Sequence, residues 1–244
     1  MIYSGQASPV RLLRRSFDSD RQNRLSLTER IFERADMTFL PFAVTKVEPH
    51  DAEELIRKLR DVTMLKDREA KPYQDAKLEL RPMSYDHFRP AQRYVLSDNL
   101  LKVQHLEWEL AKFGHDPMNL PGYLTIWTSQ SEEPIDLLPP IVEAIPEADG
   151  TAVNVINDGM HRLFSGRLAW KIPRVVLAEN LPPQYPYYAY PIPGTSPWDQ
   201  VTILAGDAIP AGYIKKWHRT ADNKRLYRDF NSAFQNVGGP RGQG

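Results

Sequence analysis

The sequence of 244 residues contains no cysteine and no long apolar run. The absence of cysteine excludes disulfide scaffolds, thiolate metal sites and a cysteine nucleophile. No apolar run approaches the length that spans a membrane, and the stretch MIYSGQASPVRLLRRSF lacks the apolar core of a signal peptide. We therefore expect a cytoplasmic protein without a membrane partner.

The sequence also lacks net charge, because 31 Lys and Arg side chains balance 31 Asp and Glu side chains. Residues 1–34 carry seven Arg and four acids (+3), and residues 213–244 carry seven Lys or Arg and two acids (+5). The residues between them sum to −8. Basic ends on an acidic body are typical of a nucleic-acid or phosphate partner, and equally of a solvated surface of mixed sign.

Composition and periodicity divide the chain into three parts. We expect a flexible basic arm over 1–35, a single α+β domain over 36–235 and a disordered tail over 236–244. Alternating apolar residues predict a strand over 39–49, and the polar, proline-interrupted stretch 66–92 predicts a loop. Two capping signals predict helices, one after Asp51 with Glu54 and one after Ser97 that ends at Gly114.

The second half of the chain changes to short apolar segments separated by acidic or glycine turns. These segments predict strands over 123–128, 137–145, 153–156 and 174–180, with a short helix over 159–169. The proline-rich aromatic stretch 185–194 is expected to be extended. Asp222 is expected to cap a last helix that carries Leu226, Tyr227, Phe230 and Phe234 on one face.

The most chemically suggestive stretch lies between the strand ending at 156 and the helix starting at 159. A helix N-terminus offers free N–H groups and a positive dipole end to an anion, and Gly159 allows close approach. Arg162 matches phosphate or carboxylate oxygens, and His161 can donate a hydrogen bond or move a proton. Asp158 could orient His161, act as a base or bind a metal bridged to phosphate. Alternatively, Asp158 only caps the helix and Arg162 pairs with a neighbouring carboxylate.

The run from Leu137 to Asn180 resembles the ParB/sulfiredoxin-like fold family. Pro140-Ile141-Val142 matches its first strand, Asp158-Gly159-Met160-His161-Arg162 its polar box, and Ile172-Pro173-Arg174-Val175-Val176 its closing strand. The resemblance implies an α+β fold with a small mixed sheet and helices as a core at about 123–182. N-terminal helical and C-terminal aromatic and basic extensions would flank that core.

The functions within this family differ, so the resemblance alone names no reaction. ParB-type members bind a nucleotide and accompany DNA, and sulfiredoxins use a cysteine where this chain has Met160. The DGxHR box is more similar to that of free serine kinases, which phosphorylate a small hydroxyl substrate with ADP or ATP. The resemblance implies that a nucleotide phosphate lies on the first helical turn, at Gly159, Met160, His161 and Arg162.

Three functions are therefore open. The first is a phosphotransferase or nucleotide hydrolase that uses ATP, ADP or CTP with Mg²⁺ and a small-molecule substrate. In that case His161 and Arg162 hold phosphoryl oxygens, and Asp158 acts at the reacting group or at Mg²⁺. Glu143 is the candidate base, unless it is a surface glutamate that closes a strand. Lys215, Lys216 and Arg228, in a basic and aromatic C-terminal cluster, would complete the phosphate site. The others are a nucleic-acid binder or nuclease, and a non-catalytic subunit of a protein complex.

Overall fold

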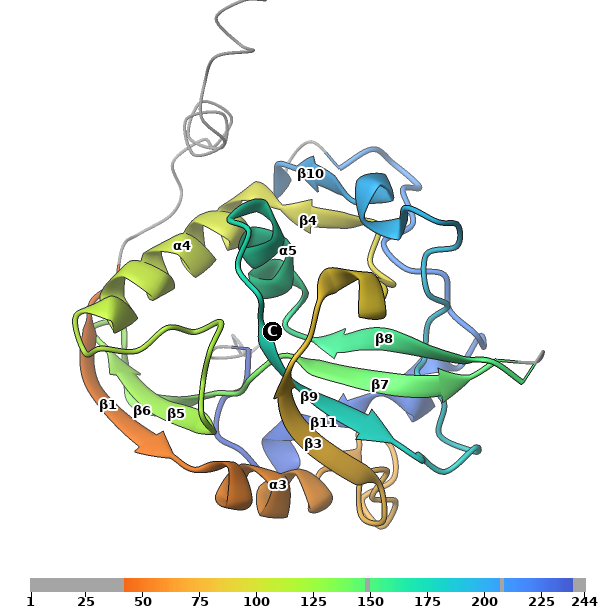
Figure 1. Ribbon diagram of the computed structural model, residues 1–244, viewed down its shortest axis with the longest axis horizontal. Coiled ribbons are helices and arrows are strands. Elements are labelled where there is room, and N and C mark those ends of the chain that lie inside the picture. The colour runs from red at the N-terminus through yellow and green to blue at the C-terminus, as the bar shows by residue number, and fades with distance from the viewer. Residues whose placement is uncertain (1–41, 148–149, 207–208, 239–244) are drawn as a thin grey trace, which may run out of the picture. The chain divides into compact units, whose positions relative to one another are not determined.

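The computed structural model describes residues 42–147, 150–206 and 209–238, all within Phe39–Gly244, the second of the two units into which the chain divides. Strands and helices follow one another in mixed order, which confirms the expected α+β class (Figure 1). The expected arm over 1–35 and the tail from 239 onward lie outside the described residues. At the last described stretch, Asn236 still donates a hydrogen bond to the carbonyl oxygen of Pro134.

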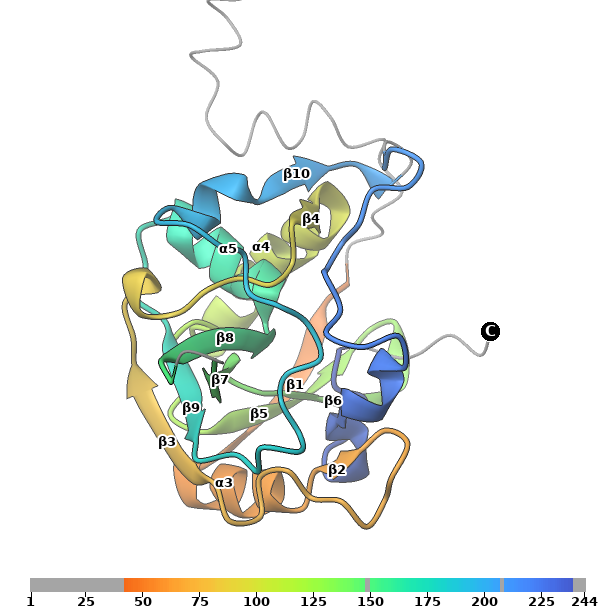
Figure 2. The ribbon, with the colours of Figure 1, turned by 90° about the vertical axis from the view of Figure 1, so that its right-hand side faces the viewer.

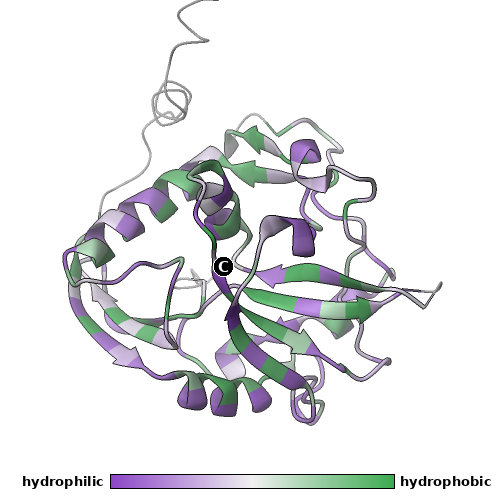
Figure 3. Ribbon diagram, in the orientation of Figure 1, coloured by the Kyte–Doolittle hydropathy of each residue, from purple (hydrophilic) through white to green (hydrophobic). Residues whose placement is uncertain are grey.

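A four-stranded sheet with the order β3-β9-β7-β8 forms the centre of the fold. Its strands are β3 (Lys77–Pro82), β7 (Ile141–Pro146), β8 (Ala152–Asp158) and β9 (Arg174–Glu179). β7 and β9 pair in parallel and the other pairs are antiparallel. A parallel pair needs a crossover, and α5 (Met160–Leu168) lies in it between β8 and β9. Apolar residues dominate β7 and β9 (Figure 3), and both strands are largely buried.

A second, antiparallel sheet has the order β1-β5-β6. Its strands are β1 (Val44–His50), β5 (Tyr123–Thr128) and β6 (Ser131–Leu137). The long helix α4 (Ser97–Ala111) packs against it through Leu110, which joins a buried cluster with Val44, Leu120, Leu124 and Ile126. The helix α3 (Ala52–Arg60) begins as predicted, because the Asp51 carboxylate accepts a hydrogen bond from the Glu54 N–H at 2.8 Å.

Two short strand pairs connect the C-terminal part of the chain to the rest. β10 (Thr202–Leu204) pairs with β4 (Tyr94–Leu96), and β11 (Arg228–Asp229) pairs with β2 (Thr63–Met64). In Figure 2 the described stretch 209–227 runs from the level of β10 down toward β2. None of the described helices is long and apolar enough to cross a bilayer.

The prediction of a loop over 66–92 is wrong in part, because this stretch contains β3. Leu78 and Leu80 alternate with charged residues and pack against the main core, a pattern that the surrounding prolines conceal. The acidic turn expected before 137 is also wrong, because β6 occupies it as an edge strand that tolerates Pro134. The strand expected over 137–145 starts at Ile141, since Pro139 and Pro140 lack the N–H groups of a ladder.

Two capping predictions are also corrected. Ser97 is the first residue of α4 rather than its cap, and Leu96 occupies the cap position without a side-chain hydrogen bond. The α-helix expected after Asp222 does not form. The chain makes a 3-10 turn (Asn223–Leu226), the strand β11 and a second 3-10 turn (Phe230–Ser232). The stretch 185–194 is extended as expected and buries Tyr187 and Ala189.

Gly159 supports a test of how tightly the junction between β8 and α5 is packed. Its φ is +85°, and a Cβ atom there would lie 2.8 Å from Cβ of Pro140. Gly114 has a similar φ of +77° with no atom within 4 Å of such a Cβ. Both substitutions to Ala incur about 1–2 kcal/mol for the left-handed backbone, and only Gly159→Ala adds a clash. Urea unfolding should therefore show the larger loss for Gly159→Ala, and equal losses would contradict a tightly packed junction.

Candidate functional site

The junction between β8 and α5 has the predicted order of strand, glycine turn and helix. β8 ends at Asp158, Gly159 takes the left-handed N-cap position, and α5 begins at Met160. Because the space beside Gly159 is filled by Pro140, the glycine is needed for the turn and for this contact. The close approach allowed by Gly159 is therefore to the protein itself.

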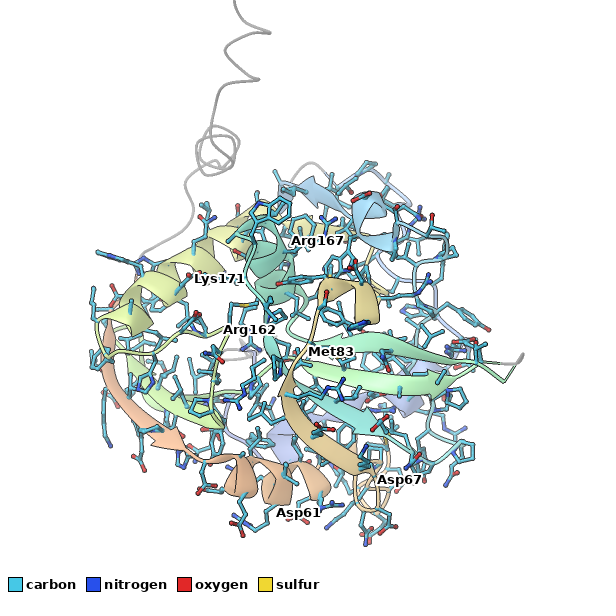
Figure 4. The ribbon with its side chains drawn as sticks, viewed as in Figure 1. Asp61, Asp67, Met83, Arg162, Arg167 and Lys171 are labelled. Atoms are coloured by element: carbon cyan, nitrogen blue, oxygen red, sulfur yellow. The ribbon has the colours of Figure 1, made fainter. Side chains whose placement is uncertain are left out.

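Arg162 is turned into the protein from this junction. Its guanidinium donates to the carbonyl oxygen of Leu138, and its Nη2 lies 3.5 Å from Oδ2 of Asp158. The side chain is buried and lies among the central side chains in Figure 4. Burial lowers its pKa, while Asp158 partly opposes this effect. Arg162 thus fastens α5 to the chain before β7, the packing role that the sequence left open for it.

His161 faces the start of α4. Its Nε2 atom lies 3.4 Å from the backbone nitrogen of Leu96 and 3.4 Å from Nδ2 of Asn99. Both of these nitrogens are donors, so Nε2 accepts and the ring proton belongs on Nδ1. Burial, together with the positive charges of Lys215 and Lys216, lowers the pKa of His161 to about 4. The imidazole is therefore neutral at neutral pH.

The segment 213–219 lies between two other extended stretches. The Arg93 N–H donates to the Lys215 carbonyl oxygen at 2.9 Å, and the Tyr190 N–H donates to the Trp217 carbonyl oxygen at 2.8 Å. Within this segment the Lys216 amine donates to the hydroxyl groups of both Tyr187 and Tyr188. It also lies 4.6 Å from the centre of the Tyr188 ring. These contacts hold the amine against a buried aromatic surface.

A pocket of about 660 Å³ opens at this segment. It is lined by Tyr188, Ile214, Lys215, Lys216, Trp217, His218 and Tyr227. Burial and the charge of Lys215, partly opposed by Asp158, lower the pKa of Lys216 to about 7. The charges of Asp158 and His161 are thus close enough to interact with the lysines. Of the predicted site residues, only Lys215 and Lys216 line the pocket.

Glu143 and Arg228 meet inside the protein, away from the pocket lining. Both side chains have 0% exposure, and two N–H groups of Arg228 donate to the two carboxylate oxygens of Glu143 at 2.9 Å each. The Tyr73 hydroxyl donates to Glu143 at 2.6 Å, and the Asn157 amide also donates to it. Glu143 is therefore not the surface glutamate that the sequence left open, and both of its oxygens already accept hydrogen bonds.

The remaining N–H groups of Arg228 bind three backbone carbonyl oxygens, those of Tyr185, Pro186 and Leu226. Its five donors thus have five acceptors. Burial opposes the charge of Arg228, but Glu143 and Tyr73 outweigh it and raise the pKa. Tyr185 and Pro186 lie just before Tyr188, and Leu226 lies just before Tyr227. Arg228 therefore fixes the two stretches that carry these pocket-lining tyrosines.

The sequence contained a partial signal for this pair. An acidic residue inside the apolar strand Ile141-Val142-Glu143-Ala144-Ile145 must be neutral or paired if that strand is buried. Nothing in the pattern identifies a partner 85 residues away. The roles of Tyr73 and Asn157 were missed for the same reason. Within the described residues, no group of three or more His, Asp or Glu side chains could hold a metal ion.

Comparison with protein families identifies the domain in which most of these residues lie. The family model of the ParB CE domain matches residues 54–202, which is more than half of the chain. The chain belongs to this family. Neither a curated protein nor a solved structure matches the chain. The match supports the ParB-like resemblance and does not separate the kinase-like branch from the others.

The match to the ParB CE domain extends well beyond the run from Leu137 to Asn180 and ends before the segment 213–219. Tyr188, Glu143 and Asp158 lie inside the matched residues, whereas Lys215, Lys216 and Arg228 lie outside them. The pocket is therefore built jointly by the ParB CE domain and the stretch that follows it.

Removing one partner of the buried pair tests how much the pair between Glu143 and Arg228 contributes to stability. We expect Arg228→Met to lower the free energy of unfolding by about 3–5 kcal/mol, because Glu143 is left buried and unpaired. Arg225→Met is a matched control, since Arg225 is exposed and pairs with Asp222 at the surface; it should change stability by less than about 0.5 kcal/mol. Adding Glu143→Gln to Arg228→Met should recover part of the loss in urea unfolding. Similar losses of unfolding free energy for Arg228→Met and Arg225→Met would contradict the importance of the buried pair.

The lowered pKa of His161 predicts an acid-sensitive step. The unfolded chain takes up a proton near pH 6.5 and the folded chain only near pH 4, so the free energy of unfolding falls as the pH drops through this window. The fall attributable to His161 should be on the order of 3 kcal/mol across the full window. Urea unfolding at several pH values should show a shallower fall for His161→Gln than for the unchanged protein. His87→Gln, at an exposed position, is the control. If the free energy of unfolding falls equally little with pH in this variant, the effect does not come from the lowered pKa of His161.

Proposed function

We propose that this ParB CE domain protein binds a nucleotide in the pocket at Lys215 and Lys216. The observation that carries the proposal is a pair of lysines in the pocket lining, opposed by the charge of Asp158 from beyond ion-pair distance. Among the residues that the structure describes, neither lysine forms an ion pair, and each helps to lower the pKa of His161. Lys215 also lowers the pKa of Lys216. An anion placed between these groups would relieve this repulsion.

The walls of the pocket support a ligand that also has an aromatic part. Tyr188, Trp217 and Tyr227 present rings that can pack on a nucleobase. A volume of about 660 Å³ falls within the range of small-molecule sites. We propose that the base packs on these rings and that the phosphates extend toward Lys215, Lys216 and the first turn of α5, where Gly159, Met160 and His161 contribute backbone groups.

The reaction that we propose is phosphoryl transfer from ATP or ADP to a small hydroxyl substrate, or hydrolysis of the nucleotide, with CTP as the other nucleotide of interest. Asp158 is the carboxylate best placed to act at the reacting group or at a nucleotide-bound Mg²⁺. Its side chain is 35% exposed and interacts with the charge of Lys216. The resemblance of the DGxHR box to that of free serine kinases supports this reaction. Glu143 is less suited to act as a base, since Arg228, Tyr73 and Asn157 occupy its oxygens.

One observation favours nucleic acid as a second candidate ligand. Trp217 and Tyr190 are 40% and 45% exposed, and the guanidinium groups of Arg93 and Arg219 lie 4.4 Å from the centres of their respective rings. Alternating rings and cations of this kind can bind a single strand. Because strand binding depends steeply on salt, titration at two salt concentrations distinguishes it from nucleotide binding in the pocket.

Thermal shift and calorimetry with ATP, ADP and CTP, each with Mg²⁺, test the proposal. We expect at least one nucleotide to stabilise the protein and Lys216→Met to weaken its binding by about 10- to 100-fold, because a charge-assisted hydrogen bond is lost. Lys102→Met, on the exposed side of α4, is the matched control and should bind normally. Asp158→Asn should bind the nucleotide and lose turnover. Absence of any nucleotide effect, or equal weakening by both lysine variants, would overturn the proposal.

A further inference from the structure

The Lys216 amine has surroundings that differ from those of a simple phosphate-binding lysine. Its partners are two phenol hydroxyl groups, those of Tyr187 and Tyr188, and within the described residues no carboxylate lies within ion-pair distance. At the same time it lines a pocket that admits a small molecule. An amine held beside a proton donor and open to a ligand can act as a nucleophile.

We propose that Lys216 is a carbonyl-reactive amine, which condenses with the aldehyde or ketone group of a small, planar, anionic molecule to form an imine. The inference goes beyond the proposed function, although it concerns the same pocket. It requires only that the pocket admits such a molecule and that the amine carries a free electron pair.

The free electron pair is available at neutral pH. Burial, together with the charge of Lys215, lowers the pKa of Lys216 to about 7, so about half of the molecules carry the neutral amine at that pH. An ordinary lysine with a pKa near 10.4 is neutral in about one molecule in 2,500 at pH 7. Adjacent cationic groups and an apolar pocket are the two features that activate lysine nucleophiles in proteins.

Tyr188 can supply and recover the protons of the condensation. Burial raises its pKa to about 12, so the hydroxyl group keeps its proton at neutral pH. The Lys216 nitrogen attacks the carbonyl carbon, the carbonyl oxygen takes the Tyr188 proton, and the phenolate recovers a proton from the new ammonium. The hydroxyl then leaves as water with the Tyr188 proton, and the phenolate recovers a proton from the iminium nitrogen. The sum is amine plus carbonyl giving imine plus water, with Tyr188 restored and nothing oxidised.

The pocket specifies the class of carbonyl compound. Lys215, which is exposed beside Lys216, can hold a carboxylate or phosphate, and the rings of Trp217 and Tyr227 favour a flat molecule. A nucleotide phosphate placed on Lys216 would keep the amine protonated and fill the same space. Nucleotide and carbonyl compound should therefore exclude each other.

Borohydride trapping on the full chain tests the inference. Pyridoxal 5′-phosphate or glyoxylate is added near pH 7, sodium borohydride reduces any imine, and peptide mass mapping locates the adduct. We expect Lys216 to be labelled at least tenfold faster than Lys102, with a rate that rises through pH 7 as the amine loses its proton. Lys216→Arg keeps the charge and should lose the adduct, and Tyr188→Phe should slow labelling. Lys215→Met should reduce the preference for glyoxylate over the uncharged benzaldehyde.

The outcomes separate this inference from the proposed function. Labelling spread evenly over exposed lysines, or a rate without an inflection near pH 7, overturns the reactive amine even if nucleotides bind. Selective labelling of Lys216 without any nucleotide effect supports the amine and overturns nucleotide binding. Peptide mapping on the unchanged protein decides the matter even if Lys216→Arg fails to fold.

Discussion

The buried pair between Glu143 and Arg228 is the interaction on which the rest of the structure depends. It joins the middle of the central sheet to a strand that follows the matched family domain, and it does so where neither charge meets water. A charged pair at such a position is tolerated only when every donor and acceptor is used, and here Tyr73, Asn157 and three backbone carbonyls complete the set. The same contacts set the position of the pocket tyrosines.

The basic residues of the protein have two different structural roles. Arg162 and Arg228 bind carbonyl and carboxylate oxygens inside the protein, whereas Lys215 and Lys216 line the pocket and form no ion pair among the described residues. His161 stands between the two groups, because it links α5 to α4 and is kept neutral by burial and by the lysines. The cationic side chains of the pocket lining are thus Lys215 and Lys216 rather than the two conspicuous arginines.

Local signals predicted the elements whose residues interact with their sequence neighbours. The Asp51 cap and the glycine turn after Asp158 depend on contacts within a few residues, and the strand over 123–128 shows its own apolar β-pattern. The failures came from distant partners. The spacing of Leu226, Tyr227, Phe230 and Phe234 is helical, yet Arg228 is pulled inward by Glu143 and the backbone pairs with β2. The pocket escaped prediction for the same reason, since its walls come from residues 188, 214–218 and 227.

The position of the pocket at the boundary of the matched domain has an evolutionary implication. The central sheet and α5 lie within residues 54–202, but most of the pocket wall is encoded after them. A replacement of that downstream stretch could exchange one ligand for another while leaving the framework intact, provided that an arginine still reaches the buried glutamate. Substitutions after residue 202 can thus reshape most of the pocket wall while the central sheet and α5 stay unchanged.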